Sequence, residues 1–287
     1  MHLNYVTNAQ LCEIIRTNLY KIPHNIDGII CIPRGGLFVG AIMSEFLHKP
    51  IYTVDSFLEG KSLGSGLGMN NDATPPNPYG TYIVVDDSSS SGASFTKASQ
   101  VLKDHKGTLL YTAVICDEQY APDNVDIILS SVPEPRIFEL NLFRLRFLNR
   151  CIVDIDGVLC VDPAPGLDLN EELYIEHILN AAPTVHLGQY VMALCTHRLI
   201  KYAPQTQQWL KQNDIKYGTL HMLAFNSIQE KIENMNTIGF LNMKTTVYDQ
   251  YPDAQLFIES NWDEAQRIYK NLHRPVLCTD TNILLQD

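Results

Sequence analysis

The segment CIVDIDGVLC, at residues 151–160, constrains this chain more than any other part of it. An apolar run ends there in Asp154 and Asp156, which are separated by one residue and therefore share one face of an extended chain. Gly157 then lets the backbone turn. Two carboxylates with different duties, a nucleophile and a general acid/base, suit phosphoryl transfer through an aspartyl-phosphate. The alternative is a calcium-binding or helix-capping Asp-x-Asp turn.

This segment resembles the first motif of the haloacid-dehalogenase phosphatases, and the resemblance extends over residues 150–285. It implies that Asp154 is the nucleophile, that Asp156 is the acid/base and that both bind Mg²⁺. The second motif of that family ends a strand in Ser or Thr, which here is Thr196 in MALCT, and it implies that Thr196 holds the transferring phosphate. We expect Arg198 either to reach the substrate phosphate or to cap the strand end.

Two further motifs of that family supply a lysine and more acids. Lys244, which precedes a strand-like segment TTVYDQY, is the expected lysine, and Lys231 is the alternative. The segment LFIESNWDEA supplies Glu259 and Asp263 as the expected metal ligands. Glu259 departs from the family, which usually has Asp at that position.

A second pair of acids lies in the string IVVDDSSSSGAS, where a predicted strand ends in Asp86 and Asp87. A turn rich in serine and glycine follows, and then a helix start. Its backbone N–H groups, its hydroxyls and the helix N-terminus together form an anion-binding cradle. The carboxylates can accept hydrogen bonds from ribose hydroxyls or hold Mg²⁺. The alternative is a solvated turn with a helix cap.

The first half resembles the type I phosphoribosyltransferases over residues 1 to 140, with serines where that family usually has threonines. The resemblance implies that Asp86 and Asp87 bind the ribose of phosphoribosyl pyrophosphate (PRPP). It implies that the 5-phosphate is bound by Ser90, Ser91, Gly92, Ala93 and Ser94. The segment CIPRGG resembles the pyrophosphate loop of the xanthine–guanine branch, which implies pyrophosphate contacts from Arg34, Gly35 and Gly36. Residues 60–80 correspond to the family's flexible lid.

Strand and helix patterns alternate through both halves, which predicts an α/β chain of two domains, each a mostly parallel sheet flanked by helices. A length of 287 residues is ample for two cores. We expect a type I phosphoribosyltransferase fold over residues 1–145 and a Rossmann-like haloacid-dehalogenase fold over residues 146–287. Residues 160–189 are too few for a large cap domain between the first two motifs, so the cap is predicted to be minimal.

The bulk properties favour a cytoplasmic enzyme that binds small molecules. The net charge of −11 disfavours a nucleic-acid partner, which needs a basic face. No apolar run reaches the length of a membrane span, and the N-terminus lacks the pattern of a signal peptide. The seven cysteines are scattered without a CxxC pair, as in a reduced compartment. The resemblance to phosphoribosyltransferases also allows a homodimer.

The pairing of the two halves predicts a bifunctional, Mg²⁺-dependent enzyme. The first domain would make a nucleoside 5′-monophosphate from PRPP and a nucleobase, and the second would remove the 5′-phosphate to release a nucleoside. The alternative is a phosphatase regulated by an N-terminal half that senses PRPP or nucleotides without catalysis.

Overall fold

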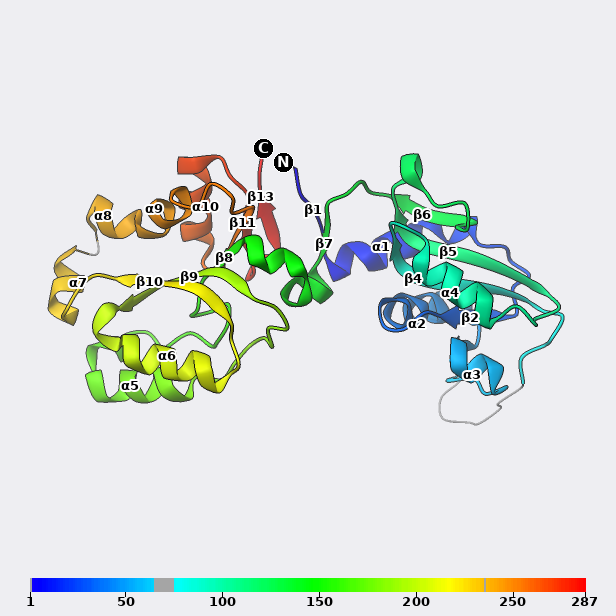
Figure 1. Ribbon diagram of the computed structural model, residues 1–287, viewed down its shortest axis with the longest axis horizontal. Coiled ribbons are helices and arrows are strands. Elements are labelled where there is room, and N and C mark those ends of the chain that lie inside the picture. Colours follow the sequence, from blue (N-terminus) through cyan, green and yellow to red (C-terminus); the bar gives the residue numbers. More distant parts are fainter. Residues whose placement is uncertain (1, 65–74, 235) are drawn as a thin grey trace. The chain divides into compact units, whose positions relative to one another are not determined.

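The computed structural model describes residues 2–64, 75–234 and 236–287 (Figure 1). The chain forms two compact units. The amino-terminal unit is Val6–Arg136, and the carboxy-terminal unit combines Met1–Tyr5 with Ile137–Asp287. The units therefore divide after Arg136, whereas the sequence analysis placed the boundary after residue 145.

The first residues belong to the carboxy-terminal unit because Leu3 packs in its hydrophobic core. Leu3 is 1% exposed and packs in one hydrophobic cluster with Ile137 and Leu148. Its backbone N–H and C=O are both bound by the Gln286 side chain, at 2.9 and 2.6 Å. Strand β1 (Asn4–Val6) pairs with β7 (Arg136–Phe138) in a two-stranded sheet. The chain therefore begins in the carboxy-terminal unit, then forms the whole amino-terminal unit, and then completes the carboxy-terminal unit.

The amino-terminal unit is built on a sheet whose pairings are all parallel. Its described strands lie in the order β3 (Ile51–Thr53), β2 (Gly28–Cys31), β4 (Thr81–Ser89), β5 (Thr108–Cys116) and β6 (Ile127–Ser131). Its helices are α1 (Asn8–Asn18), α2 (Gly35–Leu47), α3 (Val54–Leu58) and α4 (Ala93–Val101). The apolar segment KPIYTVDSF predicts a strand, but β3 ends at Thr53, whose hydroxyl accepts a hydrogen bond from the Ser56 N–H and caps α3.

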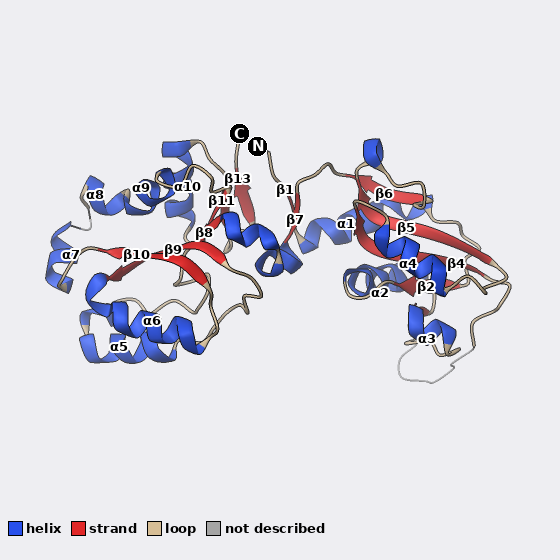
Figure 2. Ribbon diagram, viewed as in Figure 1, coloured by secondary structure: helices blue, strands red, loops and turns tan. Residues whose placement is uncertain are grey.

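Helices cover both faces of this sheet (Figure 2). Ala98 of α4 packs with Ile30 and Val84, which are paired across β2 and β4. On the other face α2 approaches so closely that a Cβ at Gly40 would overlap the Cys31 sulfur. Successive strand residues point to opposite faces, so these contacts place α4 and α2 on opposite sides.

The carboxy-terminal unit also has a central sheet, in which only the pairing of β12 with β13 is antiparallel among the described strands. The strand order is β10 (Tyr217–Leu223), β9 (Val191–Leu199), β8 (Cys151–Val153), β11 (Leu256–Glu259), β12 (Val276–Cys278) and β13 (Ile283–Leu285). The helices are α5 (Glu171–Asn180), α6 (Ala203–Gln212), α7 (Ile228–Asn234), α8 (Ile238–Leu241), α9 (Met243–Asp249) and α10 (Trp262–Leu272). Trp209 of α6 packs on one face, and α9 and α10 pack on the other.

The predicted strand TTVYDQY is wrong, because its first five residues, 245–249, lie in helix α9. Lys244, Val247 and Tyr248 are buried there, at the i, i+3 and i+4 spacing of one helical face. Val247 and Tyr248 pack against Phe257 of the sheet, and this contact overrides the β-propensity of the segment. Strand β10 was not predicted.

Each parallel sheet reverses its strand order once. In the amino-terminal unit the chain runs from β2 outward to β3 and then returns to β4 on the other side of β2. In the carboxy-terminal unit it runs from β8 to β9 and β10 and returns to β11 beside β8. Ligands of open α/β sheets bind at the carboxyl ends of the strands at such reversals. The predicted fold class, two mostly parallel sheets flanked by helices, is confirmed.

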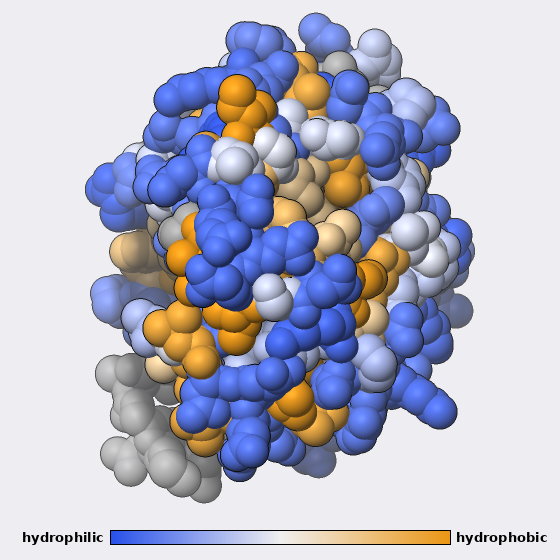
Figure 3. Space-filling view, turned by 90° about the vertical axis from the view of Figure 1, so that its left-hand side faces the viewer, coloured by the Kyte–Doolittle hydropathy of each residue, from blue (hydrophilic) through white to orange (hydrophobic). Residues whose placement is uncertain are grey.

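On the face shown in Figure 3, hydrophilic residues predominate, with hydrophobic residues in small groups between them. Within the described residues, no helix has the length and apolar character needed to cross a membrane.

Candidate active sites

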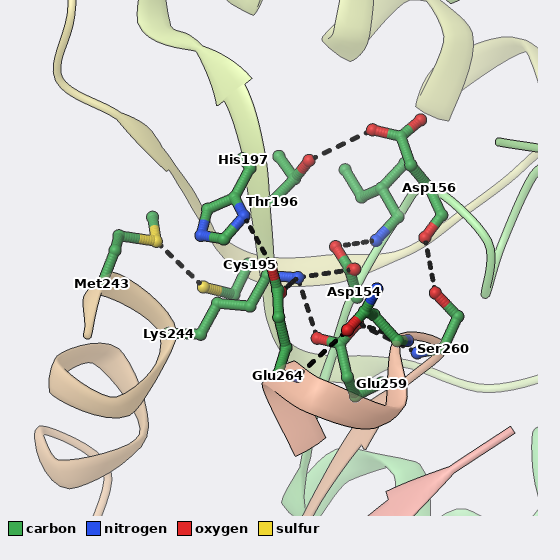
Figure 4. Close-up of polar contacts among 12 residues, drawn as sticks. Asp154, Asp156, Cys195, Thr196, His197, Met243, Lys244, Glu259, Ser260 and Glu264 are labelled. Atoms are coloured by element: carbon green, nitrogen blue, oxygen red, sulfur yellow. Dashed lines mark hydrogen bonds and ion pairs between the residues drawn. The ribbon is translucent and has the colours of Figure 1, made fainter. Parts of the chain in front are cut away.

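Lys244 is the centre of the candidate site in the carboxy-terminal unit (Figure 4). Its ammonium lies 2.8 Å from a carboxylate oxygen of Asp154, 2.8 Å from one of Glu259 and 2.6 Å from one of Glu264. Asp154 follows β8, Glu259 ends β11, and Lys244 and Glu264 come from α9 and α10. Four elements therefore bring these side chains together at the reversal point of the sheet.

The backbone fixes the acids of this cluster. One oxygen of Glu259 accepts hydrogen bonds from the N–H groups of Ser260 and Asn261, both at 3.0 Å. Asp154 accepts from the N–H of Ile155 at 2.7 Å. Burial alone would lower the pKa of Lys244, but the three carboxylates raise it well above its ordinary value, so the amine stays protonated. Burial, and then the charge of Glu259, raises the pKa of Asp154 despite the opposing effect of Lys244.

Asp156 is held by Arg198 rather than by Lys244. The Arg198 guanidinium bonds both carboxylate oxygens, with Nη2–Oδ1 at 2.6 Å and Nε–Oδ2 at 2.9 Å. Burial would raise the pKa of Asp156, but the charge and hydrogen bonds of Arg198 bring it below the ordinary value. The hydroxyl of Thr196 lies 3.4 Å from Asp156. Arg198 is 1% exposed, and its guanidinium also contacts Thr206 at 3.4 Å and the Cys160 sulfur at 3.3 Å.

Asp263 is not brought into this cluster, although the sequence analysis expected it as a metal ligand. It is exposed in the first turn of α10. The acid that enters the site is Glu264, which the sequence analysis missed. The apolar periodicity of α10 could have identified Glu264. It lies four residues before the buried Ile268 and next to the buried Ala265, which places it on the inward face of the helix.

These side chains line a cavity of about 300 Å³. Of the described side chains that line it, six are carboxylates and two are lysines. Asp162 is one of the carboxylates, and burial together with the charges of Asp156 and Asp280 raises its pKa. Lys231 of α7 also reaches the cavity, where its one ion-pair partner among the described residues is Asp168, at 2.8 Å.

The surplus of carboxylate oxygens fits Mg²⁺, which prefers such ligands and would offset their mutual repulsion. Among the described residues, no three His, Cys, Asp or Glu side chains are arranged around a metal position. The Lys244 ammonium instead lies between three of the acids. Asp154, Asp156 and Glu259 remain the expected ligands.

In the amino-terminal unit, Arg34 and the first two residues of α2, Gly35 and Gly36, lie directly against the acid pair. A Cβ added to Gly35 would overlap the Asp87 carboxylate, and one added to Gly36 would overlap the Val85 carbonyl. Only glycine permits this approach. Arg34 is exposed at the start of α2. The acids of β4 and the turn after β2 therefore share the reversal point of this sheet.

The serine-rich segment departs from the predicted turn. Strand β4 continues past both aspartates to Ser89, and Gly92, with φ +70°, then begins α4. The first N–H groups of α4 have no partner within the helix and can bind an anion. Ser91, Ala93 and Ser94 are exposed beside them.

Ser90 is already engaged by other side chains. Its hydroxyl donates to Glu134 at 2.5 Å and accepts from Arg136 at 2.8 Å. Neither partner was foreseen from the sequence. Residues 65–74 of the expected lid lie outside the described residues.

Asp86 is buried beside a second acid. Burial, and then the charge of Asp87, raises the pKa of Asp86 from its ordinary value of 3.8 to about 7. Between these values the folded protein holds a proton that the unfolded chain releases, so this group's stabilising contribution is lost as the pH rises through 7.

We therefore expect Asp86→Asn to stabilise the free protein by about 2–3 kcal/mol more at pH 8 than at pH 5, because folded Asp86 is protonated at pH 5 and charged at pH 8. Urea unfolding followed by circular dichroism at the two pH values measures this. Asp104→Asn, at an exposed acid of the same unit, is the control and should show no such pH dependence. An effect of Asp86→Asn that is the same at both pH values would contradict the expectation.

No protein-family model matches the chain, and no curated protein matches it. Among solved structures, a hypothetical protein from Neisseria gonorrhoeae with bound ppGpp is 18% identical, with a TM-score of 0.38, over 49% of this chain and 89% of that one. A purine phosphoribosyltransferase from Pyrococcus horikoshii is 18% identical, with a TM-score of 0.37, over 48% of this chain and 93% of that one. The xanthine-guanine-hypoxanthine phosphoribosyltransferase of Helicobacter pylori is 16% identical, with a TM-score of 0.36, over 48% and 92%. At these values the function has to be argued from the two sites themselves.

Proposed function

We propose that the chain is a bifunctional enzyme. The carboxy-terminal unit hydrolyses a phosphomonoester with Mg²⁺, and the amino-terminal unit transfers a phosphoribosyl group from PRPP to a nucleobase-like acceptor. The observation that carries the proposal is the meeting of Asp154, Lys244 and Glu259 from separate elements in one cavity. These were chosen from the sequence as nucleophile, lysine and metal ligand.

The geometry supports an aspartyl-phosphate route. An oxygen of Asp154 attacks the phosphorus, the bond to the ester oxygen breaks, and the leaving alkoxide takes a proton from Asp156. A water oxygen then attacks the phosphorus of the aspartyl-phosphate while Asp156 takes a proton from that water. The bond between phosphorus and the Asp154 oxygen breaks, which releases inorganic phosphate and restores the Asp154 carboxylate. Lys244 balances the charge of Asp154 and of the transferring phosphoryl group. When bound, Mg²⁺ supplies further positive charge at the phosphoryl oxygens.

The contact with Arg198 bears on both roles of Asp156. It favours the carboxylate form, which is the form that accepts a proton from water in the second step. For the first step Asp156 must gain a proton before the ester bond breaks. Arg198 also fixes the orientation of the carboxylate with two bonds.

Support for the transferase comes from the closeness of the Arg34–Gly36 turn to Asp87. The acids suit the ribose hydroxyls and Mg²⁺, and the start of α4 suits the 5-phosphate. Arg34 is exposed and suits the leaving pyrophosphate. Neutralisation of the buried Asp86 and the half-buried Asp87 by a bound cation would offset the cost of removing their charges from water.

The test is mass spectrometry of the products formed from PRPP, Mg²⁺ and a panel of nucleobases. We expect a nucleoside with the parent protein and a nucleotide with Asp154→Asn, whose transferase site is intact. If PRPP binds and is never consumed while phosphate esters are still cleaved, the amino-terminal unit is a sensor that regulates the phosphatase. If phosphate esters are not cleaved, the proposal for the carboxy-terminal unit fails.

A further inference from the structure

Asp162 is a carboxylate of the carboxy-terminal cavity that the proposed mechanism does not use. It lines the cavity and is exposed to solvent there. Among the described residues, none forms a hydrogen bond or an ion pair with its side chain. Every other described carboxylate that lines this cavity has a cationic partner, and these pairs are Asp154, Glu259 and Glu264 with Lys244, Asp156 with Arg198, and Asp168 with Lys231.

The Asp162 carboxylate lies beside the loop that carries the acid/base. A Cβ added to Gly157 would lie 2.9 Å from Oδ2 of Asp162, so this oxygen is close to the residue that follows Asp156. Of the neighbouring charges, that of Asp156 contributes most to raising the pKa of Asp162. The leaving oxygen of a substrate must reach Asp156 to take its proton. The part of the leaving group that adjoins this oxygen therefore comes close to Asp162.

The segment that carries Asp162 is held on both sides. Before it, the Val161 N–H donates to the Ala182 carbonyl at 3.0 Å. After it, Asp168 pairs with Lys231 of α7 at 2.8 Å. Two prolines between these points restrict the backbone further, because their φ is fixed. The backbone of Asp162 is therefore positioned before a substrate binds, as a residue that selects a substrate requires.

From these observations we propose that Asp162 selects the leaving group of the phosphatase reaction. The substrate is a phosphomonoester whose leaving group carries a hydroxyl or an ammonium close to the ester, and this group donates a hydrogen bond to Asp162. Phosphomonoesters with a second anion close to the ester are excluded. The inference rests on the proposed function of the carboxy-terminal unit and names the substrate class of its site.

The charge balance of the cavity favours this class. Six carboxylates line it among the described residues, and the cations that face them, Lys244, Lys231 and Arg198, are already paired. Mg²⁺ would add positive charge, but the dianionic phosphate of the substrate offsets it. A second anion on the leaving group would therefore meet the Asp162 charge, and like charges destabilise a complex. A hydroxyl or an ammonium instead donates to the open carboxylate oxygens.

The test compares three phosphomonoesters of the same length that differ in one terminal group. They are 2-hydroxyethyl phosphate, which is neutral there, phosphoethanolamine, which is cationic, and 2-phosphoglycolate, which is anionic. The value of kcat/KM is measured for each with Mg²⁺ at neutral pH, using the full chain, Asp162→Asn, and Asp253→Asn as the control at an exposed acid of the same unit. Cleavage of p-nitrophenyl phosphate reports on the phosphatase activity itself.

We expect the parent protein and Asp253→Asn to cleave the neutral and the cationic ester at least about tenfold more efficiently than 2-phosphoglycolate. Asp162→Asn should narrow this ratio about tenfold, chiefly by raising kcat/KM for 2-phosphoglycolate, because the repelling charge is removed. The amide oxygen of Asn still accepts from a hydroxyl, so cleavage of 2-hydroxyethyl phosphate should change little.

Preferential cleavage of 2-phosphoglycolate overturns the inference. So does a ratio that Asp162→Asn leaves unchanged, a ratio that Asp253→Asn narrows equally, or a failure to cleave all three esters. If p-nitrophenyl phosphate is still cleaved in these cases, the proposed phosphatase stands and only the role of Asp162 is wrong. If p-nitrophenyl phosphate is not cleaved either, the proposed function of the unit fails together with this inference.

Discussion

Asp154→Asn is expected to lower the rate of phosphomonoester hydrolysis by at least about a thousandfold, because an amide cannot form the aspartyl-phosphate. The substitution is nearly isosteric. Lys244 keeps Glu259 and Glu264 as partners, so the cluster stays paired. The rate of p-nitrophenyl phosphate cleavage under saturating Mg²⁺ measures the effect.

Asp214→Asn serves as the matched control for this experiment. Its side chain is 86% exposed in the same unit, and asparagine tolerates its positive φ of 51°. We expect parental phosphatase activity from that variant. A rate for Asp154→Asn within tenfold of the parent protein would place the nucleophile elsewhere.

Lys244→Met is expected to destabilise the carboxy-terminal unit by about 3–5 kcal/mol and to abolish hydrolysis. The variant leaves three buried or half-buried carboxylates without their common cation, and an uncompensated buried charge is among the costliest defects in a protein. Unfolding followed by tryptophan fluorescence reports on this unit, since Trp209 and Trp262 both lie in it.

Lys231→Met is the comparison that decides between the two candidate lysines. Lys231 has one ion-pair partner and a side chain that is 23% exposed, so its loss is expected to cost at most about 1 kcal/mol. Adding Glu264→Gln to Lys244→Met removes one uncompensated charge and should restore part of the lost stability. If Lys231→Met is the more damaging change, the assignment of Lys244 is wrong.

Both acid pairs could be assigned to a central strand from the sequence, and the reason is the topology of parallel sheets. An apolar run that ends in acids can be recognised from its neighbours alone, and parallel strands then bring such ends to one edge of a sheet. Asp154 directly follows β8, whereas Asp86 lies three residues before the end of β4. Helix α10 was foreseen too, since its apolar spacing is local.

What the sequence did not predict depends on contacts between distant segments. Helix α9 contains β-branched residues, and only its packing against the sheet makes it helical. Glu264 and Asp263 are neighbours in the chain, but successive residues of a helix point in different directions. Only the packing of α10 determines that Glu264 enters the cavity and Asp263 faces solvent. The partners of Ser90 are more than forty residues from it in the sequence, so a local sequence pattern cannot predict these contacts.

The pairing of Leu3 with Gln286 has a consequence for how this gene can change. The amino-terminal unit sits inside the carboxy-terminal one along the chain, as an insert between Tyr5 and Ile137. A single break in the coding sequence therefore cannot release the carboxy-terminal unit whole, because either fragment lacks part of its core. To separate the two units, the coding sequence would have to be cut on both sides of the insert, and the two parts of the carboxy-terminal unit would have to be joined. The two units are expected to be inherited, duplicated and lost together.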